Sequence, residues 1–369
     1  MATSIDVDTL RDWLTERRAV TVLDIRSEDA RVQWSIPGSV HLNAYDDLRQ
    51  GRPGALAWAE FPRDRPIVTV CNAGRVSQTA ADLLAQRGFA VHSLSGGMKA
   101  WSLAWNTARV RFNDPTVRVI QVRRTGKGCL SYVIVSDGEA AVIDPSVSVD
   151  VYLTLAAEEG GRIRTVIDTH IHADHLSRAR LLAARADAVL LLPPQQRVRF
   201  PFTAIADGQP LTVGRATLTA RRTPGHTEES MSYVLNDIAV FTGDTLFTTG
   251  VGRPDLHADA AGAQQRARLL FGSLTALRTL GPDVLVLPGH ASEPAAFDGR
   301  PSASTLAEVD SWLAAWLSSE SAFVERLLAR LPDTPPNFAR IVEVNESGEL
   351  PVGDATDLEA GANRCAVPA

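Results

Sequence analysis

Side chains that can bind a metal follow four apolar segments of the chain, each at the point where the apolar run ends. The densest group belongs to RTVIDTHIHADH, residues 164–175, whose last six positions hold three histidines and an aspartate. The other three segments end in glycine followed by histidine or aspartate: TLTARRTPGH (217–226), IAVFTGD (238–244) and DVLVLPGH (283–290). Because strand ends in an open α/β fold deliver side chains to one rim, this pattern predicts a single site built from several strands.

Seven residues are the candidate ligands of this site: His170, His172, Asp174, His175, His226, Asp244 and His290. His170 and His172 are two positions apart, so their side chains point the same way in an extended segment. Imidazole and carboxylate groups without clustered thiolates suit Zn, Fe or Mn. The three histidines outside this set, His41, His92 and His257, are interpreted as ordinary surface or loop residues.

Composition and charge describe a globular chain of 369 residues that is long enough for two or three domains. Its formal net charge of −6 argues against a nucleic-acid partner, because phosphate binders usually present a basic surface. The N-terminus lacks the pattern of a secretion signal, and no apolar run reaches about 18 residues, so we expect no membrane partner. Three widely spaced cysteines favour free thiols in a reducing cytoplasm.

The chain is expected to divide into domains near residue 110. In the first hundred residues, short strands such as TVLDI (21–25) and IVTV (67–70) alternate with helical patterns over 6–17 and 76–87. Such alternation predicts βαβ units and a parallel sheet. The segment RVRFNDPTV, residues 109–117, loses this periodicity and carries an Asn-Asp-Pro turn signal, which is typical of a linker.

After the predicted linker the pattern changes to several consecutive strands, followed by mixed strands and helices. Residues 302–331 are predicted to be helical, and ARIVEV, residues 339–344, is read as a weak strand. The predicted organisation is a first domain (1–108), a linker (109–117), a metal-binding domain (118–300) and C-terminal helices with a tail packed on the metal-binding domain (301–369).

The seven candidate ligands resemble the complete ligand set of the metallo-β-lactamase superfamily. The resemblance rests on H-x-H-x-D-H at residues 170–175, followed by His226, Asp244 and His290, and it covers roughly residues 117–299. It implies an αββα sandwich with the metal site at one edge of the two sheets. His172 is not the glutamate of the diiron flavoprotein branch, so the resemblance does not extend to that branch.

Two branches of the superfamily carry these seven residues. Glyoxalase II-like enzymes use two metals to hydrolyse a glutathione thioester, and persulfide dioxygenases use one Fe(II) and O2 to oxidise a thiol persulfide to sulfite. The loop GDTLFTTGVGRPD, residues 243–255, resembles the G-x-G-R-x-D stretch of the persulfide dioxygenases. This makes Arg253 and Asp255 candidates for substrate binding, the alternative being a surface ion pair.

The chain end ANRCAV, residues 362–367, partly resembles the Asn-Leu-x-Cys-Gly ending of the same branch. Asn363 and Cys365 match, whereas Arg364 and Ala366 do not. Cys365 is therefore a candidate for the substrate site, the alternative being an idle thiol on a mobile tail. A second departure follows His290, where Ala291 and Ser292 replace the common Asp-Tyr pair and weaken the case for glutathione as the thiol carrier.

The dioxygenase resemblance implies a role for each ligand. His170, His226 and Asp244 would surround one Fe(II), the alternative metal being Zn, and would leave coordination positions open for the persulfide and O2. The remaining members of the set would orient these three ligands, or would hold a second metal in the hydrolase alternative: His172, Asp174, His175 and His290.

The first domain contains a cysteine in a position suited to sulfur chemistry. Cys71 follows the predicted strand IVTV and precedes a glycine-containing loop and a helix, where backbone N–H groups and the helix N-terminus favour a thiolate. Arg75 adds a nearby cation. The flanking segments VLDIRSEDA, SIPGSVHLN and LSGGMKAW resemble the rhodanese domain over residues 3–106, and Cys71 falls where its sulfur-carrying cysteine belongs. The alternatives are a buried structural cysteine and a catalytically silent rhodanese module.

The leading hypothesis is a fusion of a rhodanese with a persulfide dioxygenase. The rhodanese would take sulfane sulfur from a donor such as thiosulfate or a persulfide, and the second domain would consume a thiol persulfide. The first alternative is a dinuclear Zn thioester hydrolase with a rhodanese-like appendage. The second is a non-catalytic sulfur carrier or sensor that binds metal. The sequence leaves open whether the chain forms a homodimer.

Overall fold

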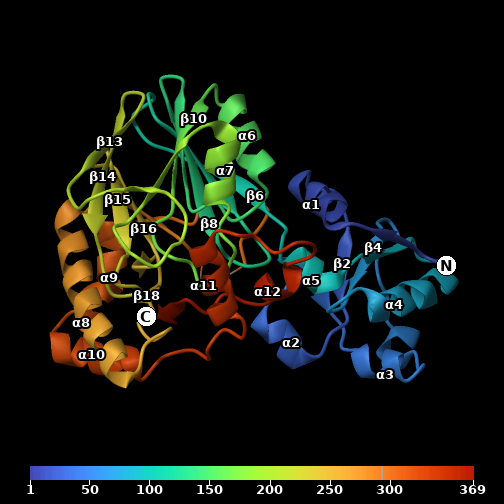
Figure 1. The fold of residues 1–369 in the computed structure, drawn as a ribbon. Coiled ribbons are helices and arrows are strands. Elements are labelled where there is room, and N and C mark those ends of the chain that lie inside the picture. Colours follow the sequence, from blue (N-terminus) through green and yellow to red (C-terminus); the bar gives the residue numbers. More distant parts are fainter. Residues whose placement is uncertain (292–293) are drawn as a thin grey trace.

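The computed structural model describes residues 1–291 and 294–369, and it shows an N-terminal part beside a larger C-terminal part (Figure 1). Ser292, one of the two residues on which the sequence departs from the persulfide dioxygenases after His290, lies outside the described residues. Among the residues that the structure describes, no helix has both the length and the apolar character needed to cross a membrane.

The N-terminal part is a parallel sheet of five strands in the order β1-β5-β4-β2-β3, with helices around it. Two of its interior strands, β4 and β2, are buried along their whole length, as their apolar runs predict. The elements are β1 (Thr3–Ile5), α1 (Val7–Thr15), β2 (Thr21–Asp24), α2 (Glu28–Gln33), β3 (Val40–His41), α3 (Tyr45–Arg49), β4 (Ile67–Val70), α4 (Arg75–Gln86), β5 (Val91–Leu94) and α5 (Gly97–Trp101).

The larger part begins with a mixed sheet of seven strands in the order β12-β11-β10-β9-β8-β7-β6. The strands from β6 to β9 pair antiparallel, and those from β9 to β12 pair parallel. Helices α6 and α7 form the crossovers from β9 to β10 and from β10 to β11, and a loop without a helix leads to β12. The elements are β6 (Asn106–Val110), β7 (Arg118–Arg123), β8 (Leu130–Ser136), β9 (Glu139–Ile143), α6 (Val149–Glu158), β10 (Arg162–Ile167), α7 (Ala179–Ala186), β11 (Val189–Leu192) and β12 (Thr203–Ala204).

A second sheet of six strands, in the order β13-β14-β15-β16-β19-β20, faces the first one. Only the pair β16 and β19 is parallel, so the ends of these two strands lie at the same edge of the sheet. The elements are β13 (Pro210–Val213), β14 (Ala216–Arg222), β15 (Met231–Leu235), β16 (Ala239–Gly243), β17 (Leu246–Phe247), β18 (Gly250–Gly252), α8 (Ala260–Leu277), β19 (Leu285–Pro288), β20 (Ser304–Thr305), α9 (Leu306–Trp316) and α10 (Glu320–Leu328).

Helices cover the outer faces of both sheets. Tyr132 and Phe241 belong to the core between the sheets, where their rings meet edge to face at 4.8 Å. The outer face of the first sheet packs against α6 and α7, and that of the second sheet packs against α8, α9 and α10 (Figure 1). This order of layers is the αββα sandwich predicted from the sequence.

The C-terminal segment crosses between the two parts of the molecule. It contains α11 (Phe338–Ser347), α12 (Thr356–Glu359) and β21 (Ala366–Pro368), and β21 extends a small sheet made of β17 and β18. Helix α12 lies beside α5 of the N-terminal part (Figure 1).

Two sequence-based predictions of local structure are wrong. Residues 339–344 belong to helix α11 and not to a strand, because Ile341 and Val344 pack against Leu176 on one helical face. Arg109 and Val110, assigned to a linker, are the last residues of β6, which pairs with β7 along its whole length.

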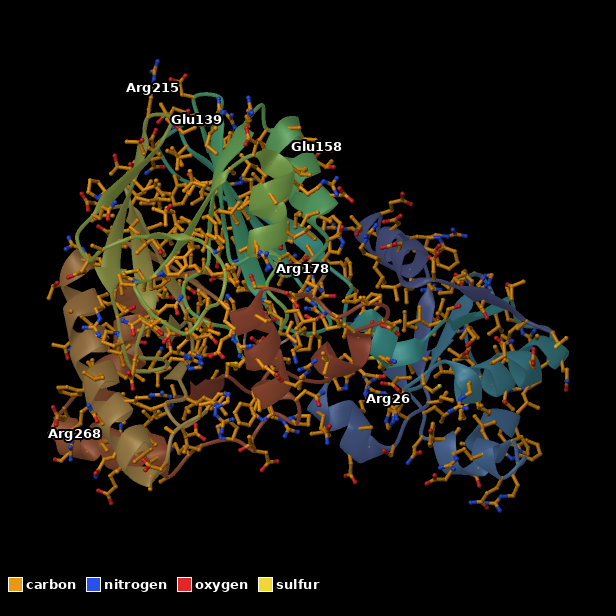
Figure 2. All side chains as sticks on the ribbon, in the orientation of Figure 1. Arg26, Glu139, Glu158, Arg178, Arg215 and Arg268 are labelled. Carbon is orange, nitrogen blue, oxygen red and sulfur yellow. The ribbon has the colours of Figure 1, made fainter. Side chains whose placement is uncertain are left out.

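A buried ion pair lies where the two parts meet. The Arg124 guanidinium donates to Glu359 at 2.7 Å and to the Ser102 carbonyl, just after α5, at 2.7 Å. Arg178 (labelled in Figure 2) approaches the other oxygen of Glu359 at 3.3 Å. Burial by itself raises the pKa of Glu359, but the two guanidinium groups lower it overall, so the carboxylate is ionised.

We predict that Glu359→Ala lowers the free energy of unfolding by about 3–5 kcal/mol, because it leaves the fully buried Arg124 charge uncompensated. The control is Arg162→Ala, which removes an exposed pair with Asp187 at 3.9 Å and should cost less than about 1 kcal/mol. Urea unfolding followed by tryptophan fluorescence measures both. Equal losses for the two variants would contradict a structural role for the buried pair.

Candidate metal centre

The seven predicted ligands meet at one edge of the two sheets, and all are at most 2% exposed. Residues 170–175 follow β10, His226 follows β14, Asp244 follows β16 and His290 follows β19. The parallel pair β16 and β19 brings Asp244 and His290 together, and the Gly289 N–H donates to the Gly243 carbonyl at 2.8 Å. A Cβ on Gly289 would lie 2.6 Å from Asp244 Oδ1, so only glycine fits there.

His170, His226 and Asp244 form a group of ligand atoms with room for a metal ion between them, which is called the open group below. Asp244 Oδ2 lies 3.8 Å from His170 Nε2 and 3.6 Å from His226 Nε2. Neither His170 Nε2 nor Asp244 Oδ2 has a hydrogen-bond partner among the described residues, although both are buried. Buried polar atoms without a partner are costly, so this group fits a divalent metal bound at its centre.

In each of these three side chains, the nitrogen or oxygen that faces away from the open group is in hydrogen-bonding contact with another group of the protein. His226 Nδ1 is 2.7 Å from the Arg253 carbonyl, and His170 Nδ1 is 2.9 Å from Thr169 Oγ1. Asp244 Oδ1 is 2.7 Å from His290 Nδ1. Such contacts fix the orientation of each side chain and leave His170 Nε2, His226 Nε2 and Asp244 Oδ2 free to bind a metal.

The protonation states also suit metal binding. Burial lowers the pKa of both His170 and His226, so these imidazoles are neutral near pH 7. Burial raises the pKa of Asp244, but the neighbouring His290 outweighs it and the pKa falls well below its ordinary range. Two neutral imidazoles and one carboxylate are the donor set of an open non-heme iron site and are also suitable for zinc.

Asp174, His175 and His290 are linked to one another by hydrogen bonds, although His175 Nε2 is buried without a partner among the described residues. His290 Nε2 is 2.8 Å from Asp174 Oδ2, and His175 Nδ1 is 3.1 Å from Asp174 Oδ1. Burial lowers the pKa of both histidines, but the carboxylates beside them prevail, raising the pKa of His175 to about 10 and that of His290 well above its ordinary value. Both rings are therefore cationic donors in this arrangement.

Cys129 joins this second group, which the sequence did not indicate. Its thiol donates to Asp174 Oδ2 at 3.3 Å, and ligand atoms of Cys129, Asp174, His175 and His290 all lie within 4.8 Å of one another. Burial raises the pKa of the Cys129 thiol, but the neighbouring His175 and His290 lower it overall. With one thiolate, one carboxylate and two imidazoles, the group has the donor types of a four-coordinate zinc site.

His172 belongs to a third group, which it forms with Asp144 and Asp168. Its Nε2 lies 3.2 Å from Asp144 Oδ1 and 3.8 Å from Asp168 Oδ1. Asp144 also accepts from the Thr169 backbone N–H at 2.7 Å, so it anchors the loop that starts the ligand sequence. Asp144 comes directly after strand β9. The candidate ligands were identified by the same position after a strand, so this signal could also have revealed Asp144.

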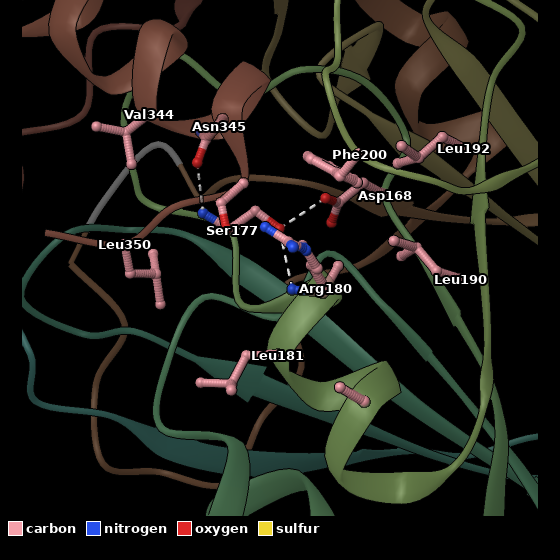
Figure 3. Close-up of a pocket in the computed structure, with 13 residues that line it drawn as sticks. Asp168, Ser177, Arg180, Leu181, Leu190, Leu192, Phe200, Val344, Asn345 and Leu350 are labelled. Carbon is pink, nitrogen blue, oxygen red and sulfur yellow. Dashed lines mark hydrogen bonds between the residues drawn. The ribbon is translucent and has the colours of Figure 1, made fainter.

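A cavity of about 330 Å³ lies under the ligand loop, between α7 and α11 (Figure 3). Ser177 donates to Asp168 Oδ2 at 2.6 Å, and the Asn345 Oδ1 accepts from the Ser177 N–H at 2.9 Å. The Asn345 amide also donates to the carbonyls of His172 and His175. Helix α11 therefore holds the ligand loop from outside the metal centre.

Arg253 and Asp255, which the sequence offered as substrate-binding residues, form an ion pair at 2.7 Å. Arg253 is 1% exposed, and its guanidinium also donates to the carbonyls of Asp333 and Arg364. Its contacts hold the C-terminal tail over the metal centre. Cys365 on that tail is buried, and its thiol lies within 4.8 Å of ligand atoms of Asp244 and His290.

Cys71 lies at the N-terminus of α4, in the N-terminal part. Its Sγ accepts from the Ser77 backbone N–H at 3.3 Å, and its carbonyl accepts from the Met98 N–H at 2.8 Å. A Cβ on Gly97 would lie 2.2 Å from that carbonyl, so α5 can approach the cysteine loop only with glycine there. Cys71 is 1% exposed, whereas Arg75, the first residue of α4, is exposed.

Comparison with protein families identifies both parts of the chain. Residues 124–290 match the metallo-beta-lactamase superfamily, and residues 6–104 match the rhodanese-like domain. A hydroxyacylglutathione hydrolase of Anaeromyxobacter dehalogenans is 33% identical over 204 residues, covering 53% of this chain and 77% of that protein. This chain belongs to the metallo-β-lactamase superfamily. It carries a rhodanese-like domain in front of its metallo-β-lactamase domain.

Relatives of two different activities are similar to the metallo-β-lactamase domain. The human mitochondrial persulfide dioxygenase ETHE1 is 35% identical over 161 residues, covering 41% of this chain and 59% of that protein. A hydroxyacylglutathione hydrolase of Acidiphilium cryptum is 35% identical over 164 residues, covering 43% of this chain and 63% of that protein. The chain thus spans less than two thirds of these two relatives, and sequence identity does not separate the two activities.

Solved structures agree on the fold. The crystal structure of ETHE1 from Myxococcus xanthus superposes with a TM-score of 0.52 at 27% identity, covering 66% of this chain and 99% of that one. A metallo-beta-lactamase from Staphylococcus aureus COL gives a TM-score of 0.58 at 27% identity, covering 64% of this chain and 74% of that one. The metallo-β-lactamase domain is thus an enzyme fold with metal-binding side chains in place.

We predict that Asp244→Ala and His226→Ala abolish stoichiometric metal binding, because each removes one of three ligands from an open site. His290→Ala is the matched variant, since this histidine contacts Asp244 from outside the open group and should leave the metal bound. Elemental analysis of iron- and zinc-loaded protein measures the outcome. Retention of the metal by Asp244→Ala would contradict the assignment.

We also predict that Cys71→Ser abolishes transfer of sulfane sulfur from thiosulfate to a thiol acceptor. Transfer of sulfane sulfur needs a cysteine sulfur that can form a persulfide, and a serine hydroxyl cannot form one. Mass spectrometry should detect one added sulfur atom on Cys71 of the unchanged protein. Cys365→Ser, which changes a buried thiol of the other domain, should keep the transfer. Transfer by Cys71→Ser would mean that another cysteine carries the sulfur.

Proposed function

We propose that the metallo-β-lactamase domain oxidises a low-molecular-weight thiol persulfide to sulfite with O2, at a single Fe(II) held by His170, His226 and Asp244. The observation that carries this proposal is the open group of ligand atoms. Asp244 Oδ2 lies 3.8 Å from His170 Nε2 and 3.6 Å from His226 Nε2 and has no hydrogen-bond partner among the described residues, whereas Asp174 is hydrogen-bonded to both His175 and His290. One three-ligand open group supports one metal with free coordination positions.

The proposed reaction consumes one persulfide, one O2 and one water, and it yields one thiol, one sulfite and two protons; the persulfide sulfur is oxidised and O2 is reduced. Bound iron would supply the redox chemistry between the persulfide and O2. The protein groups around it keep bulk solvent away from the ligands, since every candidate ligand is at most 2% exposed. The contacts of Asp244 with His290 and of His226 with Arg253 hold the ligands in one geometry.

The rhodanese-like domain supports a sulfur substrate. We propose that Cys71 accepts sulfane sulfur from thiosulfate or a persulfide and passes it to a small thiol. That product would be the substrate of the metal centre, so both domains would act on the same class of compound. The sparse, unpaired cysteines fit a reducing compartment such as the cytoplasm.

A dinuclear zinc thioester hydrolase is the second candidate. The observation in its favour is the group of Cys129, Asp174, His175 and His290, whose ligand atoms are close enough to hold another ion. Occupation of that position requires the hydrogen bond between Asp174 Oδ2 and His290 Nε2 to break and both rings to lose a proton. The one-metal arrangement avoids this cost.

We predict that iron-loaded protein consumes O2 and releases sulfite when it is given a low-molecular-weight persulfide, with about one iron per chain at full activity. An oxygen electrode and sulfite quantification measure the reaction. Zinc-loaded protein and the Asp244→Ala variant incubated with iron in the same way are the controls, and neither should consume O2. Fast thioester hydrolysis with about two zinc ions per chain, without O2 uptake, would favour the hydrolase instead.

A further inference from the structure

The cavity between α7 and α11 combines apolar walls with a buried carboxylate (Figure 3). Its volume is about 330 Å³, and Asp168 and Ser177 are among the residues that line it. Most of its other lining side chains are apolar, and the large ones are Leu181, Leu190, Leu192, Phe200, Val344 and Leu350. None of the three residues of the open group lines it, so this cavity is separate from the proposed iron site.

One oxygen of the Asp168 carboxylate has no hydrogen-bond partner. Its Oδ2 accepts from the Ser177 hydroxyl at 2.6 Å, whereas Oδ1 is buried and unpartnered among the described residues. The residue is only 7% exposed, so bulk water does not solvate this oxygen. Because buried polar atoms are normally paired, the free oxygen indicates that a bound molecule supplies a hydrogen-bond donor here.

The charges around Asp168 do not balance. Ligand atoms of Asp144, Asp168 and His172 all lie within 4.8 Å of one another, so two carboxylates share one imidazole. In the part of the chain that the structure describes, the His172 ring is the only basic group within 4.0 Å of either carboxylate. A buried carboxylate without a compensating charge is costly, so the missing partner is a cation.

Arg180 does not supply this cation, although it lies at the exposed side of the cavity. Its guanidinium donates to the Gly348 carbonyl at 2.8 Å and lies 5.2 Å from the centre of the Phe200 ring. A Cβ on Gly348 would lie 2.3 Å from that ring, so the ring packs closely against the end of α11. These contacts hold Arg180 at the rim and leave the carboxylate to a ligand.

We propose that this cavity binds a small organic cation, a primary amine with an apolar group, whose ammonium pairs with Asp168. The apolar group would contact Leu190, Leu192 and Phe200. A metal ion fits the cavity less well, because the apolar side chains offer it no ligand atoms. This binding site is additional to the proposed sulfur chemistry and does not depend on it.

The wall of the same cavity holds the ligand loop of the metal centre. Asn345 lines the cavity, and its amide donates to the carbonyls of His172 and His175 at 2.8 Å and 2.9 Å. Its Oδ1 accepts from the Ser177 N–H at 2.9 Å. A molecule bound against Asp168, Ser177 and Asn345 would restrain the ligand loop against α11. The site would therefore act as an effector site that stiffens the metal centre.

The first test compares two probes of the same shape. 2-Phenylethylamine carries an ammonium group near neutral pH, and 2-phenylethanol carries a hydroxyl at the same position, so the pair isolates the charge. In NMR titrations of the full-length, metal-free protein, the amine should bind at least about tenfold more tightly than the alcohol, as expected for a charge-assisted hydrogen bond. Asp168→Asn removes the charge, so it should bind the two probes within about twofold of each other.

A second variant leaves Asp168 in place. Ala184 is exposed on α7 and lines the cavity, so Ala184→Phe should fill space there and weaken both probes at least about tenfold. The matched control is Val189→Phe, because Val189 is exposed and its side chain points to the opposite face of β11 from that of Leu190. It should bind both probes as the unchanged protein does.

Three results would overturn the binding site. They are equal binding of amine and alcohol to the unchanged protein, an unchanged preference in Asp168→Asn with a native circular dichroism spectrum, and unchanged binding to Ala184→Phe. Absence of amine binding counts as the first of these.

The second test measures amide hydrogen exchange of residues 170–178 in the metal-free protein. At about ten times its Kd, the amine should slow this exchange by about threefold to tenfold, because opening of the loop would release the ligand. The alcohol at the same concentration should have little effect, and Asp168→Asn should lose the response to the amine. Exchange that stays unchanged while the amine is bound would overturn the effector role.

Discussion

The two oxygens of Asp244 determine how the metal centre is arranged. Oδ2 faces the two neutral imidazoles of His170 and His226, and Oδ1 pairs with the cationic ring of His290. This carboxylate separates the open group of ligands from the hydrogen-bonded group around Asp174. Its place is set by the end of β16, and the absence of a side chain at Gly289 leaves room for it. A change at either position would disturb both groups together.

The sequence reveals ligands where local structure controls their position. Each of the seven follows an apolar run, and a buried strand must end at the rim of a sheet, so their meeting point could be predicted without coordinates. The split of the seven into an open group and two hydrogen-bonded groups could not be predicted. It depends on Asp144 and Cys129, which meet His172 and Asp174 only through contacts between distant segments.

Helix α11 shows that secondary structure, too, can depend on contacts between distant segments that the sequence does not reveal. ARIVEV is rich in β-branched residues, which favour strands, yet the segment is helical because Ile341 and Val344 complete an apolar cluster with Leu176. Its Asn345 then holds the carbonyls of His172 and His175. Likewise, the sequence pattern suggested that Arg253 binds substrate. In the fold its guanidinium pairs with Asp255 and donates hydrogen bonds to backbone carbonyls.

The two domains are joined without a long connection. Only residues 102–105 separate α5 from β6, and α12 closes the boundary from the other end of the chain. Asp357 of α12 pairs with Lys99 of α5 at 2.8 Å, and Glu359 pairs with Arg124 and accepts from the Leu176 N–H beside the ligand loop. A different rhodanese module could not be exchanged into this protein at a simple junction. Such a chimera would need to retain a matching α12, because that short helix belongs to the contact surface of both domains.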